Sequence, residues 1–502
     1  MSLAVINSRA AVGVEAPEVT VEVHLANGLP ALSVVGLPEA AVKESKDRVR
    51  SAIVNSGFEF PARRITVNLA PADLPKDGGR FDLPIALGIL AAAGQLKCPS
   101  LADYEFLGEL ALTGALRPVG GVLPSAARCA ERGRGLIVPA DNGAEAALVG
   151  TLQAHAAADL PAVCRHLVGD ARLAEARLDA PPPAPDYPDL AEVRGQHQAK
   201  RCLEIAAAGG HSLLLVGPPG TGKSMLASRL PGILPAMSDA EALAAASVRS
   251  VSGLGFSPTD WARRPFRSPH HSASHVALIG GGARPRPGEV SLAHHGVLFL
   301  DELPEFSRMA LEALREPLET GRVTISRAAA QTDYPAQFQL VAAMNPCPCG
   351  YWGDPATECR CTPEQIARYR GKLSGPLLDR IDMIVEVPRL PAKALQATRG
   401  GQQSAQVQAR VEQARQRQTR RAECINARLG PDLLERHAPV APDDRALLAQ
   451  AMDRMGLTAR AYHRILRVAR TIADLESRDA LERHHITEAL GYRRMDPSRR
   501  AA

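Results

Sequence analysis

The chain contains 502 residues, of which 45% are hydrophobic and 23% charged. This length suggests about three or four domains, and the composition excludes a small disulfide-stapled scaffold and a chain disordered throughout. The 59 basic and 54 acidic residues give a net charge of +5, and 8 of the basic residues are lysines, so arginine dominates. No apolar run approaches the length of a membrane span, and we expect a cytoplasmic protein with no membrane partner.

The first part of the chain, residues 1–178, alternates between strand and helix patterns. Segments 19–25 and 65–69 alternate apolar and polar residues as strands do, whereas 39–55 and 83–96 have the apolar spacing of helices. These patterns predict an α+β domain at the N-terminus.

The clearest boundary is a proline-rich segment at residues 179–189. Proline fixes φ and lacks an N–H donor, so we expect an extended, semi-rigid linker here. The linker would separate the N-terminal domain from a second domain at 190–390 and a third at 391–502.

The second domain contains short segments that are wholly or almost wholly apolar, at 212–216, 296–300 and 339–343, separated by helical stretches. Strands of this kind are typical of a parallel sheet buried on both faces. After residue 391 the strand signals vanish, and 402–429, 446–475 and a segment near Ile486 predict helices. The sequence therefore predicts an α/β core followed by a helical C-terminal domain.

A glycine-rich loop follows the first apolar strand and opens a helical stretch at 225–230. The loop consists of Gly217, Pro218, Pro219, Gly220, Thr221, Gly222, Lys223 and Ser224. Its glycines let backbone N–H groups surround phosphate oxygens, Lys223 can reach the β- and γ-phosphates, and the Ser224 hydroxyl can bind Mg²⁺. This loop predicts a site for ATP and Mg²⁺.

Polar residues also end the other two apolar strands. Asp301 and Glu302 follow the second strand, and Asn345 follows the third. The carboxyl ends of parallel strands share one edge of the sheet, where Asp301 can hold Mg²⁺ and Glu302 can orient and polarise an attacking water. These positions predict hydrolysis of ATP, with the Asn345 amide at the same edge.

Four cysteines, Cys347, Cys349, Cys359 and Cys361, form two close pairs nine residues apart. Four thiolates in two pairs are typical of a structural zinc site, which we expect in an insertion at 345–363. The C-x-C spacing is tighter than the usual C-x₂-C, so unligated thiols or a redox pair remain alternatives. The adjacent pairs His270, His271 and His294, His295 are either further ligands or polar contacts near the site.

The motifs GPPGTGKS, VLFLDE and SGPLLDRID resemble those of AAA+ ATPases of the magnesium-chelatase-like branch. The stretches RPFRSPHHSAS (264–274), NPCPCGYWGD (345–354) and ILRVARTIADL (465–475) resemble the ComM/YifB family over nearly the full length. The resemblance implies that Asn345 is the first sensor, Arg380 an arginine finger for a neighbouring subunit, and Arg460 the second sensor. A finger that acts between subunits implies a homo-hexameric ring.

The resemblance also implies two insertions that face a central pore, at 246–268 and at a hairpin spanning 320–327. Arg322 and Arg327 on the hairpin are candidates for DNA contacts, and a solvated hairpin is the alternative. The stretch 399–428 has seven arginines and two glutamates, an excess of five charges. Arg415 and Arg420 in this stretch could contact a phosphate backbone, or the stretch is simply a solvated helix face.

Residues 1 to about 170 resemble the domain of ATP-dependent Lon-type proteases, which is similar to domain 2 of ribosomal protein S5. In those proteases a serine nucleophile and a lysine base follow two glycine turns, but Arg80 and Leu123 occupy these places here. Neither residue can attack a carbonyl or accept a proton at neutral pH, so we expect a non-proteolytic domain. Lys76 and Arg80 either touch DNA or a neighbouring subunit, or support a structural turn.

The leading hypothesis is a ring-forming ATPase that acts as a DNA helicase or branch-migration translocase during recombination of imported DNA. The alternative is a chelatase-like ATPase that remodels a protein complex. A protease is opposed by Arg80 and Leu123.

Overall fold

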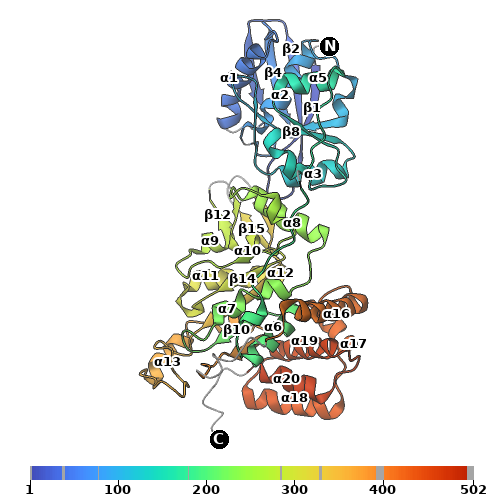
Figure 1. The fold of residues 1–502 in the computed structure, drawn as a ribbon. Coiled ribbons are helices and arrows are strands. Elements are labelled where there is room, and N and C mark those ends of the chain that lie inside the picture. Colours follow the sequence, from blue (N-terminus) through green and yellow to red (C-terminus); the bar gives the residue numbers. More distant parts are fainter. Residues whose placement is uncertain are drawn as a thin grey trace.

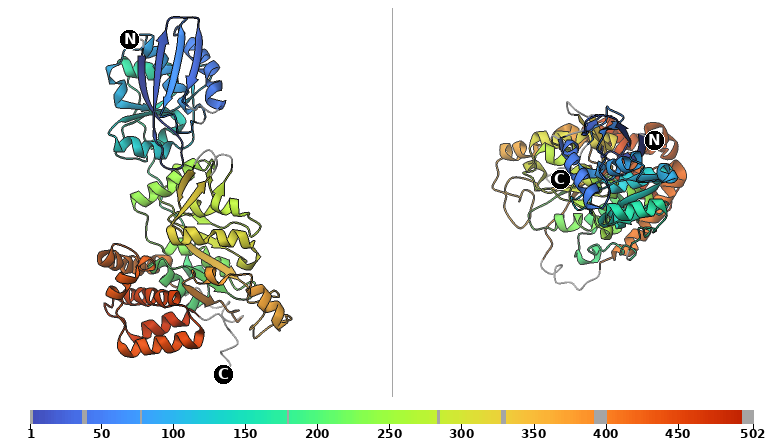
Figure 2. Two further views of the ribbon diagram at one scale, coloured as in Figure 1. Left: turned by 180° about the vertical axis from the view of Figure 1, so that it is seen from behind. Right: turned by 90° about the horizontal axis from the view of Figure 1, so that it is seen from above.

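The computed structural model describes residues 3–36, 40–76, 78–178, 180–282, 285–326, 331–391 and 401–493. The molecule is elongated, with the N-terminal region at one end, the α/β core in the middle and the C-terminal helices on one flank (Figure 1). A view from behind shows the helix α13 (Pro363–Arg370) protruding on the opposite flank of the core (Figure 2). Within the described ranges, no helix is both long and apolar enough to cross a membrane.

The N-terminal region is a mixed α/β domain built on a seven-stranded sheet. The strand β2 pairs antiparallel with β1 and β4, and the other neighbours in the sheet pair in parallel. In spatial order the strands are β3 (Ala31–Val35), β4 (Arg64–Ala70), β2 (Glu18–Ala26), β1 (Leu3–Arg9), β5 (Tyr104–Phe106), β8 (Gly135–Pro139) and β9 (Ala154–Ala157). The accompanying elements are α1 (Ala40–Asn55), α2 (Asp82–Ala92), α3 (Val122–Glu131), α4 (Gly143–Ala146), α5 (Leu160–Val168) and the short hairpin β6 (Glu109–Leu110) and β7 (Leu116–Arg117).

The middle region contains a five-stranded, wholly parallel sheet. Its strands in spatial order are β11 (Phe266–Arg267), β14 (Val297–Leu300), β17 (Gln339–Met344), β10 (Leu213–Val216) and β18 (Met383–Glu386). The three strands predicted from apolar runs are confirmed, and their residues are buried because the sheet is covered on both faces. The strands β11 and β18 carry no pattern in the sequence that predicted them.

The helices of the middle region surround this sheet, and two small ribbons extend from it. The helices are α6 (His197–Gly209), α7 (Lys223–Ala227), α8 (Asp239–Val251), α9 (His275–Ile279), α10 (Glu289–Leu292), α11 (Arg308–Ala313), α12 (Arg315–Thr320), α13 and α14 (Gly375–Leu378). The ribbons are β12 (Gly280–Gly281) with β13 (Arg286–Pro287), and β15 (Arg322–Ser326) with β16 (Gln331–Pro335). The second ribbon is the predicted hairpin; Arg327 lies outside the described residues.

The C-terminal region is helical, as predicted. One of the predicted helices is in fact two separate helices. Its helices are α16 (Ser404–Ala422), α17 (Pro431–His437), α18 (Pro442–Met455), α19 (Ala459–Leu475) and α20 (Arg483–Gly491). The single helix predicted at 446–475 is wrong because Gly456, with φ +62°, ends α18, and the Thr458 side chain then caps α19.

The N-terminal domain packs against helix α8 with the segment that follows it, and against the hairpin of β15 and β16. Apolar residues of α3 share one buried cluster with Ala246 of α8, and Leu243, Phe256 and Trp261 pack against that cluster. The backbone N–H of Gly121 donates to the Ser250 carbonyl (3.2 Å). A side chain built on Gly13 would meet Thr332 of β16 at 2.7 Å, so this loop lies directly on the hairpin.

Lys76 and Arg80 support the fold of the N-terminal domain. The prediction that these side chains contact DNA or another subunit is wrong. Both residues are buried. Lys76 donates to the Pro71 carbonyl, and Arg80 donates to the carbonyls of Arg9 (3.2 Å) and Gly120. Leu123 is also fully buried, so neither of the two protease-like positions presents a reactive group to solvent.

Candidate active site

The glycine-rich loop joins the carboxyl end of β10 to the amino end of α7, beside the end of β17. Lys223 is buried, and its ammonium donates to the carbonyls of Gly217 (2.7 Å) and Pro218 (2.9 Å) and to the Asn345 amide oxygen (3.1 Å). Burial lowers the pKa of Lys223, and the nearby Asp301 and Glu302 carboxylates oppose that shift. The loop therefore places the Lys223 ammonium in contact with the Asn345 side chain.

Ser224 and Asp301 meet at the same sheet edge although they are 77 residues apart. The Ser224 hydroxyl donates to the Asp301 carboxylate at 2.6 Å. One hydroxyl and one carboxylate oxygen placed side by side are suitable ligands for Mg²⁺ beside a nucleotide, because this hard cation takes oxygen ligands. These two residues would hold the metal, whose chemistry would be to neutralise charge on the phosphates.

Glu302 has the left-handed φ of +52°, which is uncommon for a residue other than glycine, asparagine or aspartate. Its backbone N–H donates to the Asp301 carboxylate (2.9 Å), and its own carboxylate lies 3.2 Å from Nδ1 of His271. Glu302 is largely exposed at the end of β14, where it can act on a water molecule. Such strained conformations concentrate at functional sites.

The contact of His271 with Glu302 was not predicted from the sequence. His271 follows β11, the parallel neighbour of β14, so both residues lie at the carboxyl edge of the sheet. The other histidines make polar contacts: His270 Nδ1 lies 2.8 Å from the Ser272 hydroxyl, and His294 Nδ1 accepts the Gln337 N–H at 3.0 Å. None of these four histidines belongs to a metal-ligand group among the described residues.

Arg380 lies at the other edge of the sheet from the glycine-rich loop. It precedes β18 and is buried, with its guanidinium paired to Glu319 and donating to the Pro376 carbonyl (2.7 Å). A cavity of about 770 Å³ opens here between the amino edge of the sheet and helices α16 and α19. Its lining includes Arg264, Arg380, Arg415, Arg428, Arg464 and Arg467.

Arg460 is exposed at the start of α19, one helical turn before Arg464 on the same helix face. Arg464 donates to the Arg380 carbonyl (3.1 Å) and pairs with Asp382, which directly precedes β18. The structure therefore brings Lys223, Ser224, Asp301 and Asn345 together, and it leaves Arg380 at the opposite edge of the sheet, where its carbonyl accepts a hydrogen bond from the Ser212 hydroxyl.

Four of the five arginines of α16 are engaged within their own chain. Arg410 pairs with Glu204 (2.6 Å), Arg421 with Asp474 (2.7 Å) and Arg417 with Asp479 (3.4 Å). Arg415 points into the cavity and donates to the Ala207 carbonyl (2.7 Å from Nη2), while burial lowers the pKa of its guanidinium to about 10. Arg420 and, on β15, Arg322 are exposed. Of the three candidate DNA contacts that lie within the described residues, these two are open to solvent.

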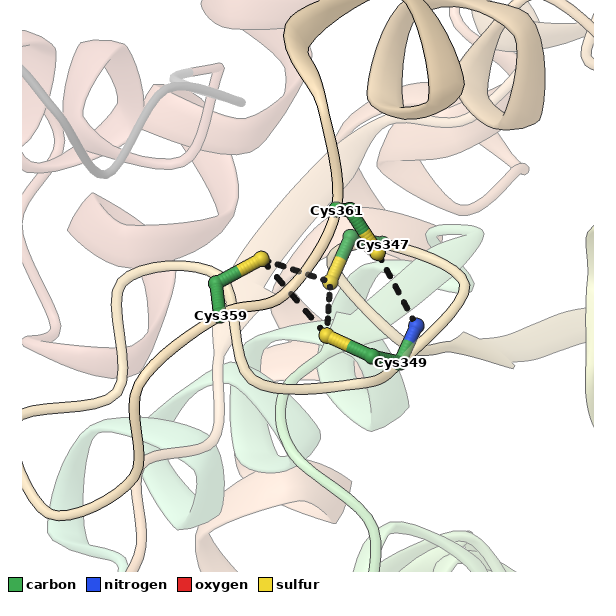
Figure 3. A group of neighbouring side chains, drawn as sticks. All are labelled: Cys347, Cys349, Cys359 and Cys361. Atoms are coloured by element: carbon green, nitrogen blue, oxygen red, sulfur yellow. Dashed lines mark hydrogen bonds between the residues drawn. The ribbon is translucent and has the colours of Figure 1, made fainter.

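The four cysteines form one cluster, in which their sulfurs face one another (Figure 3). Cys347 Sγ lies 3.4 Å from Cys349 Sγ and 3.6 Å from Cys359 Sγ, and all four sulfurs lie within 4.8 Å of one another. Two sulfurs on one tetrahedral zinc ion at about 2.3 Å are separated by about 3.8 Å, so the cluster fits that ion.

Backbone groups around the cluster favour a thiolate. Burial acts to raise the pKa of Cys349, but hydrogen bonds at the backbone of Tyr351 and Arg360 prevail and lower it to about 6. Burial raises the pKa of Cys359 to about 12. One cysteine of the cluster is therefore ready to bind a cation at neutral pH, and the other thiols lose their protons when the metal binds.

Three family models, all of the magnesium-chelatase subunit ChlI, match successive parts of the chain. Residues 21–142 match "Subunit ChlI of Mg-chelatase", residues 189–395 match "Magnesium chelatase, subunit ChlI", and residues 401–493 match "Magnesium chelatase, subunit ChlI C-terminal". These matches cover the N-terminal domain, the parallel core and the helical region in the order in which the structure shows them.

Full-length relatives are also similar to this chain. The YifB protein of Salmonella typhimurium is 53% identical over 99% of this chain and 98% of its own length, and competence protein ComM of Haemophilus influenzae gives the same three values. The magnesium-chelatase 38 kDa subunit of Cereibacter sphaeroides is 26% identical over 61% of this chain and 92% of its own length.

Proposed function

The chain belongs to the ComM/YifB family of magnesium-chelatase-like ATPases, and from that premise we propose that it is a ring-forming DNA motor. Its activity would be that of an ATP-dependent helicase or branch-migration translocase, used when imported DNA is recombined. The observation that carries the ATPase step is the convergence of Lys223, Ser224, Asp301 and Asn345 at one edge of the parallel sheet.

Hydrolysis follows from the positions of these residues. The backbone N–H groups of the glycine-rich loop and Lys223 would hold the β- and γ-phosphates, and Ser224 and Asp301 would hold the accompanying Mg²⁺. Glu302 would orient the water that attacks the γ-phosphorus, in line with the bond that breaks to release ADP, and Asn345 would contact the γ-phosphate. Positioning and charge neutralisation provide most of the acceleration in reactions of this type.

Assembly into a ring is supported by the two edges of the core sheet. One edge carries the candidate nucleotide site, and the other carries Arg380 and the arginine-lined cavity. When subunits join head to tail, the arginine edge of one subunit can meet the nucleotide edge of the next. Six subunits related in this way would close a homo-hexamer with Arg380 as the finger and Arg460 as the second sensor.

DNA as the track is supported by the name of the ComM relative, which is a competence protein, and by exposed Arg322 on the hairpin. Arg322 and Arg420 remain candidates for phosphate contacts. A structural zinc ion held by the four cysteines is part of the same proposal, because the thiol geometry suits it.

The second candidate is an ATPase that remodels a protein complex. It is favoured by the similarity to a magnesium-chelatase subunit over 61% of the chain, and by the pairing of Arg410, Arg417 and Arg421 with acids of their own chain. Arginines that are neutralised in this way are less available to a phosphate backbone.

The deciding experiment measures ATP turnover by the full-length protein with single-stranded, duplex and branched DNA. A DNA motor should hydrolyse ATP several times faster with its preferred DNA. Glu302→Gln should still bind ATP but not hydrolyse it, and should form a DNA complex at low salt. If no DNA accelerates turnover and Glu302→Gln binds none, the motor is excluded and the remodelling ATPase remains.

A further inference from the structure

The four-cysteine cluster begins two residues after Asn345, where the chain leaves the core sheet. We use the name cysteine knuckle for residues 347–361. The Pro346 carbonyl, between Asn345 and the knuckle, accepts a hydrogen bond from Nε of Arg370 (3.3 Å). The guanidinium of Arg370 also lies over the Trp352 ring, 4.2 Å from its centre. Arg370 at the end of α13 thus contacts Pro346, just before the knuckle, and Trp352, within it.

The knuckle lies directly against the glycine-rich loop. A Cβ atom built on Gly350 would lie 2.7 Å from Cδ of Pro219 and 3.9 Å from Cγ of Asn345. Gly350 also has φ +88°, which favours glycine. The space beside Gly350 is therefore filled by Pro219 of the phosphate-binding loop, and Asn345, which contacts Lys223, lies next to it.

Sulfur atoms hold this turn in shape. The Trp352 N–H donates to Cys347 Sγ (3.3 Å), and the Cys349 N–H donates to Cys361 Sγ (3.4 Å). The Gly350 N–H donates to the Cys347 carbonyl (3.0 Å). N–H donors of this kind favour thiolates, and a cation among the sulfurs would join residues 347–349 to residues 359–361.

We propose that the cysteine knuckle positions Pro219 and Asn345, so that nucleotide affinity depends on the metal bound by the four cysteines. The proposal rests on the proposed ATP and zinc sites. Without the metal, the two halves of the knuckle, residues 347–349 and 359–361, lose their cross-link. Gly350 would then no longer support the glycine-rich loop, which would have to be ordered by the nucleotide itself.

The test uses the full-length, metal-loaded protein and measures zinc content together with the affinity for a fluorescent ATP analogue. Gly350→Ala keeps all four cysteines but places a methyl group against Pro219. We expect about one zinc ion per chain and nucleotide affinity at least about tenfold weaker, a change of about 1.4 kcal/mol. Gly353→Ala is the matched control: it has a similar φ of +81° and is exposed, and both readouts should equal those of the wild type.

A second arm keeps the test decisive if Gly350→Ala does not fold. Zinc is removed from the wild-type protein with a chelator, nucleotide affinity is measured, and zinc is then restored. The proposal predicts a similar loss of affinity that zinc reverses. Unchanged affinity in Gly350→Ala, or in metal-free wild-type protein, overturns it. Wild-type protein that binds no nucleotide refutes the proposed ATPase itself, and protein that never contains zinc refutes the metal site.

Discussion

The imidazole of His271 and the carboxylate of Glu302 are 3.2 Å apart, measured from Nδ1 to Oε2. The two residues follow neighbouring parallel strands, β11 and β14, which meet at the candidate nucleotide edge. A histidine that contacts the glutamate from the next strand can fix the direction in which its other oxygen points. His271 is in this sense a positioning residue for Glu302.

Replacing His271 with alanine should lower kcat for ATP about tenfold and leave KM within about twofold, because a positioning contact acts mainly on the chemical step. His271→Asn, whose amide can replace Nδ1, should recover part of the rate. Steady-state ATP hydrolysis measures both constants. His270→Ala is the control, since His270 bonds to Ser272; equal rates for His271→Ala and the wild type would contradict the prediction.

Subunit mixing tests whether Arg380 acts on a neighbouring site. Arg380→Ala and Glu302→Gln should each abolish nearly all turnover, but an equal mixture should recover up to about a quarter of the wild-type rate, since that share of interfaces is intact. The measurement is ATP hydrolysis after co-assembly. A mixture of Lys223→Ala with Glu302→Gln, which damages one edge alone, should recover nothing. An inactive Arg380 mixture would mean that Arg380 serves its own chain.

Arg80→Ala should destabilise the N-terminal domain by about 2–4 kcal/mol, because the Arg9 and Gly120 carbonyls lose a buried charged donor. Urea unfolding followed by circular dichroism measures this loss. Arg117→Ala is the control, since Arg117 is exposed and lies 3.8 Å from Glu109; we expect a change within about 0.5 kcal/mol. If Arg80→Ala is as stable as the wild type, the N-terminal domain does not depend on the hydrogen bonds that Arg80 donates.

His294 should make the core sensitive to acid. Burial, together with His295 and Arg428, lowers the pKa of His294 to about 3. Below about pH 6.5 the unfolded chain takes up a proton that the folded chain refuses, so stability falls as pH falls, by about 2 kcal/mol at pH 5.

His294→Asn removes this titration and keeps an acceptor for the Gln337 N–H. The variant should therefore lose about 2 kcal/mol less stability than the wild type between pH 7.5 and pH 5, measured by urea unfolding at each pH. Parallel losses in the two proteins would show that His294 is protonated in the folded core.

The candidate nucleotide site could be predicted because the parallel direction of the strands alone brings its residues together. Once three apolar strands are parallel, Ser224, Asp301 and Asn345 must share one edge, whatever their separation in sequence. His271 was expected either as a further ligand or as a polar contact near the site, but its pairing with Glu302 escaped prediction because β11 has two residues, too few for a periodic pattern. The contact of Arg464 with Arg380 and Asp382 also escaped prediction, since it depends on how α19 packs beside the start of β18.

The proline-rich segment near residue 180 marks the boundary in sequence more clearly than the packing does. Leu123 and Val122 of α3 belong to the same buried cluster as Ala246, so the apolar surface of α8 is completed by a domain that precedes the prolines. A protein fragment that begins after this linker would expose that surface to water. We therefore expect such a truncated ATPase to self-associate during purification, and the intact chain to be the smallest well-behaved unit for biochemistry.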